Sequence, residues 1–275
     1  LGNTEWKILD DPFLNFKEVL DNPSFINSLK NTGLIWLLNF FPQLALALIL
    51  TAWFTSHSVK LKGVGFFKVI FYMPNIITAS TVAILFNALF QYPIGPMNDI
   101  FVRLHIMEKP YDFLVNRKVA QGVLMFIQTW MWYGYTMIII ISGVLGIDPE
   151  IFEAADIDGA NGWQVFWKIT IPSIKTIMLF TLVTSLIGGL NMFDIPLNFV
   201  LAQGPDNATL TTSVLIYRLG FTGKYRTCIA SAMSMIMFVI IVVCSALLFF
   251  ALRDKEAAAF EKLAKKRSKS KKTCT

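Results

Sequence analysis

The sequence predicts an all-α membrane protein, a polytopic helix bundle in which five transmembrane helices are visible. Its 275 residues are 55% hydrophobic and only 15% charged, and their mean hydropathy is +0.58. That much apolar surface exceeds what the core of a soluble domain can bury. The apolar residues also gather in long runs, as they do in helices that cross a bilayer. The bilayer is therefore the expected solvent for most of the chain.

Five runs of about 20 mostly apolar residues have the length that a membrane-spanning helix needs. They cover residues 33–54, 69–90, 119–141, 177–199 and 229–252. Asp194 is the one formally charged residue inside them. We therefore expect one transmembrane domain over residues 31–252, preceded by a segment 1–30 and followed by a tail 253–275.

The two flanking segments set the expected orientation. With the C-terminus in the cytoplasm, 14 of the 24 basic residues fall on the inner side, and nine of those 14 lie in the tail 253–275. Cytoplasmic segments of membrane proteins are enriched in Lys and Arg, so the tail favours this placement, whereas the loops between spans are close to neutral. Segment 1–30 is then extracytoplasmic. Its mixture of aromatic and acidic residues predicts an amphipathic segment that is either a lid against a partner or an interfacial anchor.

The stretch 145–175 is the most polar one between two spans, and its layout suits docking better than simple chain reversal. Asp148 can cap a short helix that has Pro149 at its first position. The small side chains of Ala154 and Ala155 would let another protein approach that helix closely. Gly159 can adopt the left-handed conformation that ends it.

A second helix is expected directly after that glycine. Asn161 and Gln164 stand three residues apart, as the two partners of a capping box do. Apolar and aromatic residues then recur at helical spacing: Trp163, Phe166, Trp167, Thr170 and Ile174. The stretch therefore predicts a helix-turn-helix element.

The pattern Glu153-Ala154-Ala155, three residues, Gly159, nine residues, Ile169, two residues, Pro172 resembles the EAA loop of inner-membrane permeases in binding-protein-dependent ABC importers. We refer to residues 145–175 as the EAA-like loop. The resemblance implies that this loop couples the chain to an ATPase. The residues expected at that contact are Glu153, Ala154, Ala155, Asp158, Gly159, Ala160, Ile169 and Pro172.

Three downstream segments resemble the sugar-importing, maltose-permease-like branch of that family, namely Phe193-Asp194, Gly204-Pro205 and Asn207-Ala208-Thr209. Two upstream segments, Asn31-Thr32 and Gly63-Val64-Gly65-Phe66-Phe67, resemble the family as a whole. The resemblance implies a multi-pass permease in a bacterial inner membrane, surrounded by lipid. It implies as partners a second permease subunit, two ATPase subunits and an extracytoplasmic solute-binding protein, with a sugar as solute and no nucleic acid. Because such permeases usually carry another span upstream, we expect a sixth helix to precede the five visible ones.

The solute pathway is expected around the fourth span. Asp194 inside an apolar run is unfavourable unless it faces a partner or a water-filled cavity. Gly188, Gly189 and Pro196 nearby indicate a helix broken at membrane depth. The alternative is a helix end near the outer interface, where an acid is tolerated. The candidate pathway residues are Tyr133, Tyr135, Gly189, Asn191, Phe193 and Asp194, with structural packing an equal alternative for the two tyrosines.

Motifs of catalysis are scarce. No phosphate-binding loop ending in Gly-Lys-Ser/Thr occurs, so ATP hydrolysis is expected on a partner chain and not here. His57 and His105 lack metal-ligand spacing, and Cys228, Cys244 and Cys274 fit no metal or redox pattern, so we expect no metal, cofactor or catalytic residue. The alternatives are a stand-alone ion-coupled carrier or channel and, less favoured, a membrane-embedded enzyme. A carrier or channel would be expected to show ionisable groups within the spans, where the sequence offers only Asp194. The enzyme is disfavoured because no cluster of His, Asp or Ser recurs within the spans.

Overall fold

The computed structural model describes residues 11–56, 62–200, 204–222 and 225–252. Within these residues the secondary structure is helical, and no β-strand is present. The basic tail 253–275, the first ten residues, and His57 and Cys274 lie outside the described residues. The expectations that fall on them stay predictions.

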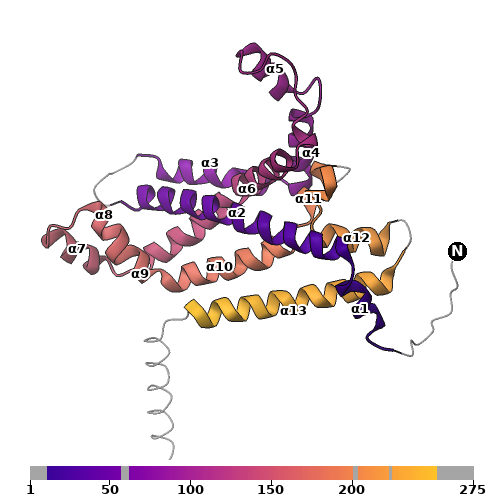
Figure 1. Ribbon diagram of the computed structural model, residues 1–275. Coiled ribbons are helices and arrows are strands. Elements are labelled where there is room, and N and C mark those ends of the chain that lie inside the picture. The colour runs from indigo at the N-terminus through magenta and orange to yellow at the C-terminus, as the bar shows by residue number, and fades with distance from the viewer. Residues whose placement is uncertain (1–10, 57–61, 201–203, 223–224, 253–275) are drawn as a thin grey trace, which may run out of the picture.

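Long helices that run side by side form the body of the molecule (Figure 1). They are α2 (Pro23–Phe54), α3 (Val64–Ile76), α6 (Arg117–Leu145), α10 (Lys175–Leu190) and α13 (Thr227–Leu252). The shorter helices are α1 (Leu14–Leu20), α4 (Ala79–Leu89), α5 (Pro96–Arg103), α7 (Pro149–Ile157), α8 (Gly162–Val165), α9 (Ile171–Ser173), α11 (Asp194–Phe199) and α12 (Thr212–Phe221). Short 3-10 turns cover Phe113–Val115 and Pro205–Asn207, and a π-helical turn covers Phe166–Thr170.

The predicted all-α membrane bundle is confirmed by the length and composition of these helices. In the described part of the chain, four helical stretches are long and apolar enough to cross a membrane, namely α2, α6, α10 with α11, and α13. The pair α3 and α4 makes a fifth when the two are taken as one bent span.

We expected the second span, 69–90, to be one continuous helix, but the structure divides it into α3 and α4. Helices α3 and α4 meet at an angle of 85°. Pro74 lacks the N–H that would bond one turn back in α3, and Ile77 and Thr78 are extended between the helices. The Thr78 hydroxyl accepts a hydrogen bond from the Thr81 N–H at 3.4 Å and so begins α4 anew.

The fourth predicted span is interrupted, as the glycines and the proline in its sequence indicated. Helix α10 ends at Leu190, and α11 begins at Asp194 after three intervening residues. The Asn191 side-chain amide turns back and donates to the Ile187 carbonyl at 2.8 Å. The same carbonyl also accepts from the Asn191 backbone N–H at 3.2 Å, so Asn191 closes the end of α10 with both of its donors.

Helices α3 and α6 approach closely because one position carries no side chain. A Cβ at Gly134 would lie 2.1 Å from the carbonyl oxygen of Phe71. Helices α2 and α6 are joined by a buried polar contact, in which the Gln43 amide donates to the Thr136 hydroxyl at 2.8 Å. Small residues and side-chain hydrogen bonds are the usual means of holding helices together in lipid.

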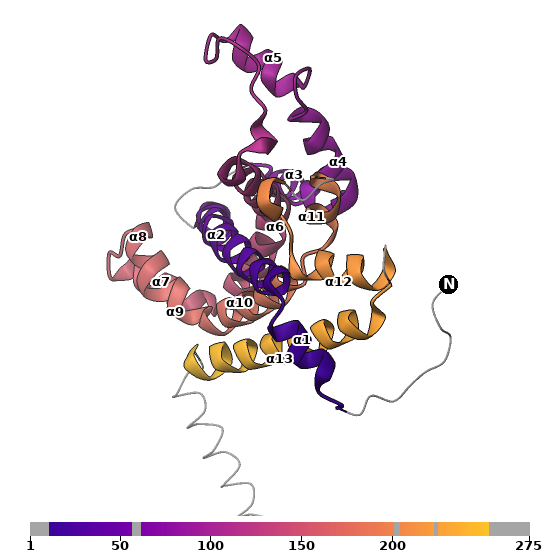
Figure 2. The ribbon, with the colours of Figure 1, turned by 45° about the vertical axis from the view of Figure 1, so that its right-hand side comes forward.

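Helix α1 lies against α13 at one end of the bundle (Figures 1 and 2). Val19 is buried there, Phe13 and Leu20 are exposed, and Glu18 forms an ion pair with Arg226. This is the two-faced pattern expected of an amphipathic segment. Whether the exposed face meets lipid or a partner stays a prediction.

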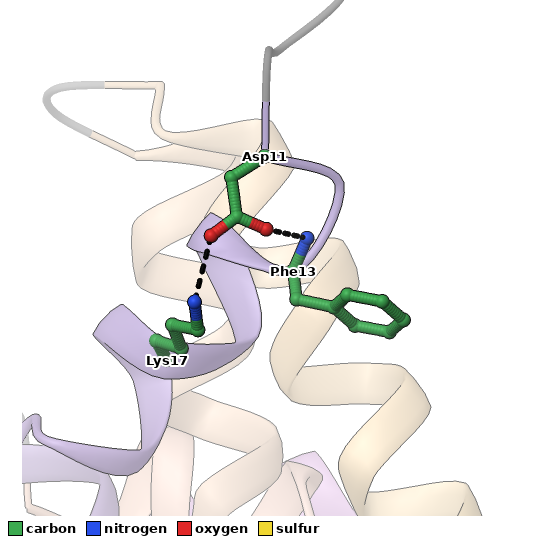
Figure 3. Close-up of polar contacts among 3 residues, drawn as sticks. All are labelled: Asp11, Phe13 and Lys17. Atoms are coloured by element: carbon green, nitrogen blue, oxygen red, sulfur yellow. Dashed lines mark hydrogen bonds and ion pairs between the residues drawn. The ribbon is translucent and has the colours of Figure 1, made fainter.

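Asp11 organises the start of α1 (Figure 3). Its carboxylate accepts hydrogen bonds from the Lys17 ammonium at 2.7 Å and from the Phe13 N–H at 2.8 Å. The lysine, and after it the backbone N–H, hold the pKa of Asp11 below its ordinary value of 3.8.

The two ends of the bundle carry different elements. Helices α7, α8 and α9 lie at the end where α13 finishes, and α1, α11 and α12 lie toward the opposite end (Figure 1). The EAA-like loop therefore lies at the end of the bundle where α13 reaches Leu252. That this end faces the cytoplasm stays a prediction.

Candidate coupling loop and central cavity

Helix α7 of the EAA-like loop begins and ends as its sequence indicates. The Asp148 carboxylate accepts from the Glu150 N–H at 3.0 Å, and Pro149 occupies the first helical position. At the other end Gly159 has φ +71°. The Ala160 N–H then donates to the Ala155 carbonyl at 3.0 Å, and the Gly159 N–H donates to the Asp156 carbonyl at 3.1 Å. These two bonds form a Schellman motif, which closes the helix end.

The second half of the loop opens on a complete capping box. The Asn161 side chain accepts from the Gln164 N–H, and the Gln164 side chain accepts from the Asn161 N–H, both at 2.9 Å. The expected regular helix then widens into the π-helical turn Phe166–Thr170. Pro172 has no N–H for the Lys168 carbonyl, and this missing bond accounts for the wider turn.

The loop presents most of its predicted contact residues on the surface. Glu153, Ala154, Asp158, Gly159 and Pro172 are exposed, and Ala160 and Ile169 are half-buried. Ala155 is different, because its side chain is only 6% exposed. It faces the protein's own interior, so Ala154 is the member of the pair that leaves room for a close approach.

Two buried side chains fix the loop to the bundle. Phe152 of α7 and Ile174, which follows α9, are 8% and 1% exposed. Both belong to an apolar cluster with Val144 and Met137 of α6 and Ala47 of α2. The loop therefore moves with the ends of α2 and α6 rather than as a free segment.

A cavity of about 340 Å³ opens between α2, α6, α10 and the break before α11. Its aromatic walls are Trp36, Trp132, Tyr135 and Phe193. Uncharged polar side chains also line it, among them Asn39, Gln43, Gln128, Thr136, Thr184 and Asn191. Asp194 completes the set as the acid.

The cavity brings together five of the six residues expected on the solute pathway. Tyr135, Gly189, Asn191, Phe193 and Asp194 all line it. Tyr133 does not, because it packs edge-on against Phe71 of α3 with ring centroids 6.2 Å apart. For that tyrosine the packing alternative is the one that the structure supports.

Sequence reasoning missed the contribution of α2. Trp36, Asn39 and Gln43 lie one turn apart on that helix and reach the cavity together with Gln128 of α6. The available signal was the recurrence of amides at helical spacing within apolar spans. Such polar groups in a membrane helix face a cavity or a partner rather than lipid.

Gly189 allows one wall of the cavity to form. A Cβ at this position would lie 1.9 Å from Cδ1 of Trp36. The indole N–H donates to the Ser185 hydroxyl at 3.2 Å, and the ring stacks on Phe40 at 5.9 Å. Trp36 is therefore held flat against α10 with one face available to the cavity.

Two hydrogen bonds position Asp194 at the break between α10 and α11. The Ser80 hydroxyl of α4 donates to the carboxylate at 3.5 Å, and the Asn198 amide donates to the Asp194 backbone carbonyl at 2.8 Å. The side chain itself stays exposed on the cavity wall. It is thus at a helix start and on a cavity at the same time.

A polar clamp joins segments that lie far apart in the sequence. The buried Asn31 amide donates to the carbonyls of Asn207 and Leu210 at 2.8 and 3.3 Å. The neighbouring Thr32 hydroxyl accepts from the Thr212 N–H at 3.0 Å. The Asn31-Thr32 and Asn207-Ala208-Thr209 segments, both singled out by their sequence, thus form one contact.

The comparisons with known proteins agree with this architecture. Residues 31–255 match the family described as "Binding-protein-dependent transport system inner membrane component". The chain belongs to this family. It is a multi-pass permease subunit of the inner membrane, and the stand-alone carrier or channel is not favoured.

Relatives cover most of this permease. The lactose transport system permease protein LacF of Rhizobium radiobacter is 32% identical over 243 residues, which are 88% of this chain and 80% of LacF. The multiple sugar-binding transport system permease protein MsmF of Streptococcus mutans is 27% identical over 234 residues, 85% of this chain and 78% of MsmF. The sn-glycerol-3-phosphate transport system permease protein UgpA of Agrobacterium fabrum is 29% identical over 236 residues, 86% and 78% of the two chains.

Solved structures share the fold. A chain of a bacterial ABC transporter involved in the import of the acidic polysaccharide alginate matches with a TM-score of 0.78 at 24% identity, over 89% of this chain and 85% of that one. A chain of the bacterial alginate transporter in complex with its alginate pentasaccharide-bound periplasmic protein matches with a TM-score of 0.74 at 25% identity, over 88% and 82%. The overall fold of this chain is therefore shared with chains of these alginate transporters.

Proposed function

We propose that this permease carries a sugar or oligosaccharide across the bacterial inner membrane as one of two permease subunits in an ABC importer. An extracytoplasmic binding protein delivers the solute, and two ATPase subunits hydrolyse ATP. The observation that carries the sugar assignment is the central cavity, which combines aromatic walls with uncharged polar groups. The names of the lactose and multiple-sugar relatives support the same solute class.

Sugars need both kinds of surface. The apolar face of a pyranose ring stacks on an aromatic side chain, and its hydroxyl groups need hydrogen-bond partners, since an unpaired buried hydroxyl is unfavourable by about 1 to 3 kcal/mol. Trp36 and Tyr135 offer ring faces, while Asn39 and Asn191 offer carbonyl oxygens. Alternating access would present these groups first to the binding protein and then to the cytoplasm.

The EAA-like loop is the proposed link to ATP hydrolysis. Its exposed surface around Glu153 and Gly159 would seat on an ATPase subunit. Its buried anchors, Phe152 and Ile174, pack on α2 and α6, which also line the cavity. Closure of the ATPases would then move the cavity walls directly, because packed helices transmit displacement.

The cavity is tested by uptake into proteoliposomes that contain the complete importer. Asn191→Ala or Asp194→Ala should reduce uptake of the native sugar by about tenfold, the effect of roughly 1.4 kcal/mol, while the ATPase still co-purifies. Loss of the ATPase instead would mean that these residues are structural. Normal uptake with both changes combined would place the pathway elsewhere.

The loop is tested by co-purification and by ATP hydrolysis coupled to transport. Gly159→Val should weaken both, because a β-branched side chain is strained at φ +71°. Gly159→Asn is the matched control, since asparagine tolerates the left-handed conformation. Glu153→Lys should weaken docking without this strain. Wild-type coupling in both Gly159→Val and Glu153→Lys would overturn the assignment of the loop.

An ion-coupled carrier would behave differently in the same proteoliposomes. For the proposed importer, uptake should require ATP on the side of the membrane where the ATPase subunits lie. It should persist when ion gradients are dissipated. Uptake driven by an ion gradient in the absence of ATP would favour the carrier. No ATPase subunit should then be needed.

A further inference from the structure

The charge that lines the central cavity is of one sign, negative. Among the described residues that line it, Asp194 is the acid, and no lysine, arginine or histidine is present. Ser80 is the hydrogen-bond donor that reaches the Asp194 carboxylate, at 3.5 Å. No ion pair with Asp194 is formed within the described part of the chain, so its charge acts on whatever enters the cavity.

The amide side chains on the cavity walls are oriented by bonds to the protein. Asn39 donates to the Ile35 carbonyl at 2.9 Å, and Asn191 donates to the Ile187 carbonyl at 2.8 Å. Gln128 donates to the Met192 sulfur at 3.8 Å. In each amide one N–H is engaged and a second remains, and the carbonyl oxygen receives no hydrogen bond from the described residues.

The hydroxyl groups of α10 are of two kinds. Thr181 and Thr184 donate to carbonyls of their own helix at 2.8 and 2.9 Å and so present their acceptor lone pairs. Ser185 accepts from the Trp36 indole and keeps its own O–H as a donor. The wall therefore offers both donors and acceptors to sugar hydroxyls, and Asp194 is its charged group.

Such a wall discriminates between solutes by their chemistry. A sugar hydroxyl or an ammonium group can donate to these oxygens. A carboxylate or a phosphate only accepts hydrogen bonds, and its usual partners are arginine, lysine and clustered N–H groups. Near Asp194 an anionic group would also meet a like charge.

We infer that the cavity selects uncharged sugars and rejects uronic acids and sugar phosphates, with Asp194 as the residue that sets this preference. The inference rests on the proposed function of the cavity as the solute site. It specifies that the transported sugar is uncharged. The permease thus adds its own selection to that of the binding protein.

The charge of the cavity is measured with a cysteine placed on its wall. Thr184 donates only within its own helix, so Thr184→Cys is a small change. It is introduced after Cys228, Cys244 and Cys274 have been replaced by alanine, in the complete importer reconstituted in nanodiscs. Labelling rates are then compared for a cationic and an anionic methanethiosulfonate, each normalised to its rate with a free thiol.

The cationic reagent should be preferred by about tenfold, the size of a 1.4 kcal/mol electrostatic difference. Asp194→Asn should remove most of that preference. Asp99→Asn is the matched control, because Asp99 lies on α5 outside the cavity and pairs with Arg103. A preference for the anionic reagent, or one that Asp194→Asn leaves unchanged, would overturn the inference.

Protection of the same cysteine separates this inference from the proposed function. Neutral oligosaccharides (lactose, arabinobiose and chitobiose) should include one that slows labelling, whereas digalacturonate should not. Asp194→Asn should let digalacturonate protect at least in part. Protection by none of the sugars would contradict the proposed function itself. Equal protection by neutral and acidic sugars would contradict the charge selection alone.

Discussion

The EAA-like loop and the central cavity differ in how far apart their residues lie in the sequence. The loop uses neighbours: Asp148 caps the helix that begins at Pro149, and Asn161 pairs with Gln164 three residues on. The cavity takes Trp36 from α2, Gln128 from α6 and Asp194 from the break before α11. The loop therefore follows from local rules, whereas the cavity exists only when four elements are packed together.

This difference predicts how each region responds to substitution. A local cap is one of several contributions, so its loss should be small and confined to the loop. A close approach between helices has no substitute, so a single added methyl group should disturb the whole assembly. The glycines and polar side chains described above allow this contrast to be tested.

The largest effect is expected at the crossing of α3 and α6. Gly134→Ala places a Cβ 2.1 Å from the Phe71 carbonyl oxygen, and backbone atoms cannot move aside as a side chain can. We expect a loss of about 3 kcal/mol or more in stability, the upper range for overpacking. Gly122→Ala on the same helix is the control, because nothing lies within 4 Å of that position. Thermal unfolding of the purified complex measures both, and equal melting temperatures would contradict the close approach.

The polar clamp should come next. Asn31→Leu leaves the carbonyls of Asn207 and Leu210 without the amide that reaches them, at an expected loss of about 2 kcal/mol for buried polar groups. Asn75→Leu removes only a longer bond of 3.4 Å to Met131 and serves as the comparison. Limited proteolysis of the 204–212 segment should accelerate in the first variant and not in the second. If both variants are cleaved at the wild-type rate, the clamp does not hold this segment.

Substitutions in the cavity wall should reduce stability only modestly and uptake strongly. Gly189→Ala overlaps the Trp36 indole, which can turn away only by losing its bond to Ser185. We expect a stability loss of about 1 to 2 kcal/mol together with strongly reduced uptake. The adjacent Gly188 also lines the cavity, but a Cβ there meets nothing within 4 Å, so Gly188→Ala should keep wild-type stability and is the control for the overlap with Trp36. Normal uptake in Gly189→Ala would remove Trp36 from the pathway.

The same contrast explains what the sequence could and could not predict. Capping by Asp148, the left-handed Gly159 and the Asn161–Gln164 box follow from residue types at short spacing, and the structure has all three. The apolar runs predicted the helices, because length and hydropathy are also local. Ala155 was expected on the docking face, but which side of α7 faces the bundle is a tertiary property.

Packing also decided the remaining differences. The 85° bend between α3 and α4 follows from Pro74 together with the extended Ile77 and Thr78, yet a proline alone does not fix the angle. Tyr133 and Tyr135 are neighbours in the sequence with similar side chains. Their rotation about α6 sends one to Phe71 and the other to the cavity. Only the contacts with α3 and α10 distinguish them.

A local cap should have a modest effect by comparison. Asn161→Ala removes the side-chain acceptor for the Gln164 N–H, a change worth about 1 kcal/mol at a helix start. Asn161→Ser keeps an acceptor and should behave as wild type. Hydrogen exchange of residues 161–165 should accelerate in the alanine variant, while exchange of α6 stays unchanged. Acceleration in α6 as well would mean that the loop and the bundle are one cooperative unit.

The smallest effect is expected where α1 begins. Asp11→Asn removes the ion pair with Lys17, and because both groups are exposed to solvent the pair contributes little. Sugar uptake at pH 7 should be unchanged, and only the hydrogen exchange of residues 13–15 should accelerate slightly. The pKa of Asp11 is depressed in the folded protein, so its contribution is present above 3.8 and is lost as the pH falls through the lower folded value. Wild-type exchange should therefore approach that of Asp11→Asn below pH 3.8, and the difference between them should also shrink at high salt. If Asp11→Asn instead reduced uptake at pH 7, this local motif would affect the transport assembly, and the separation between local motifs and packed regions would fail at α1.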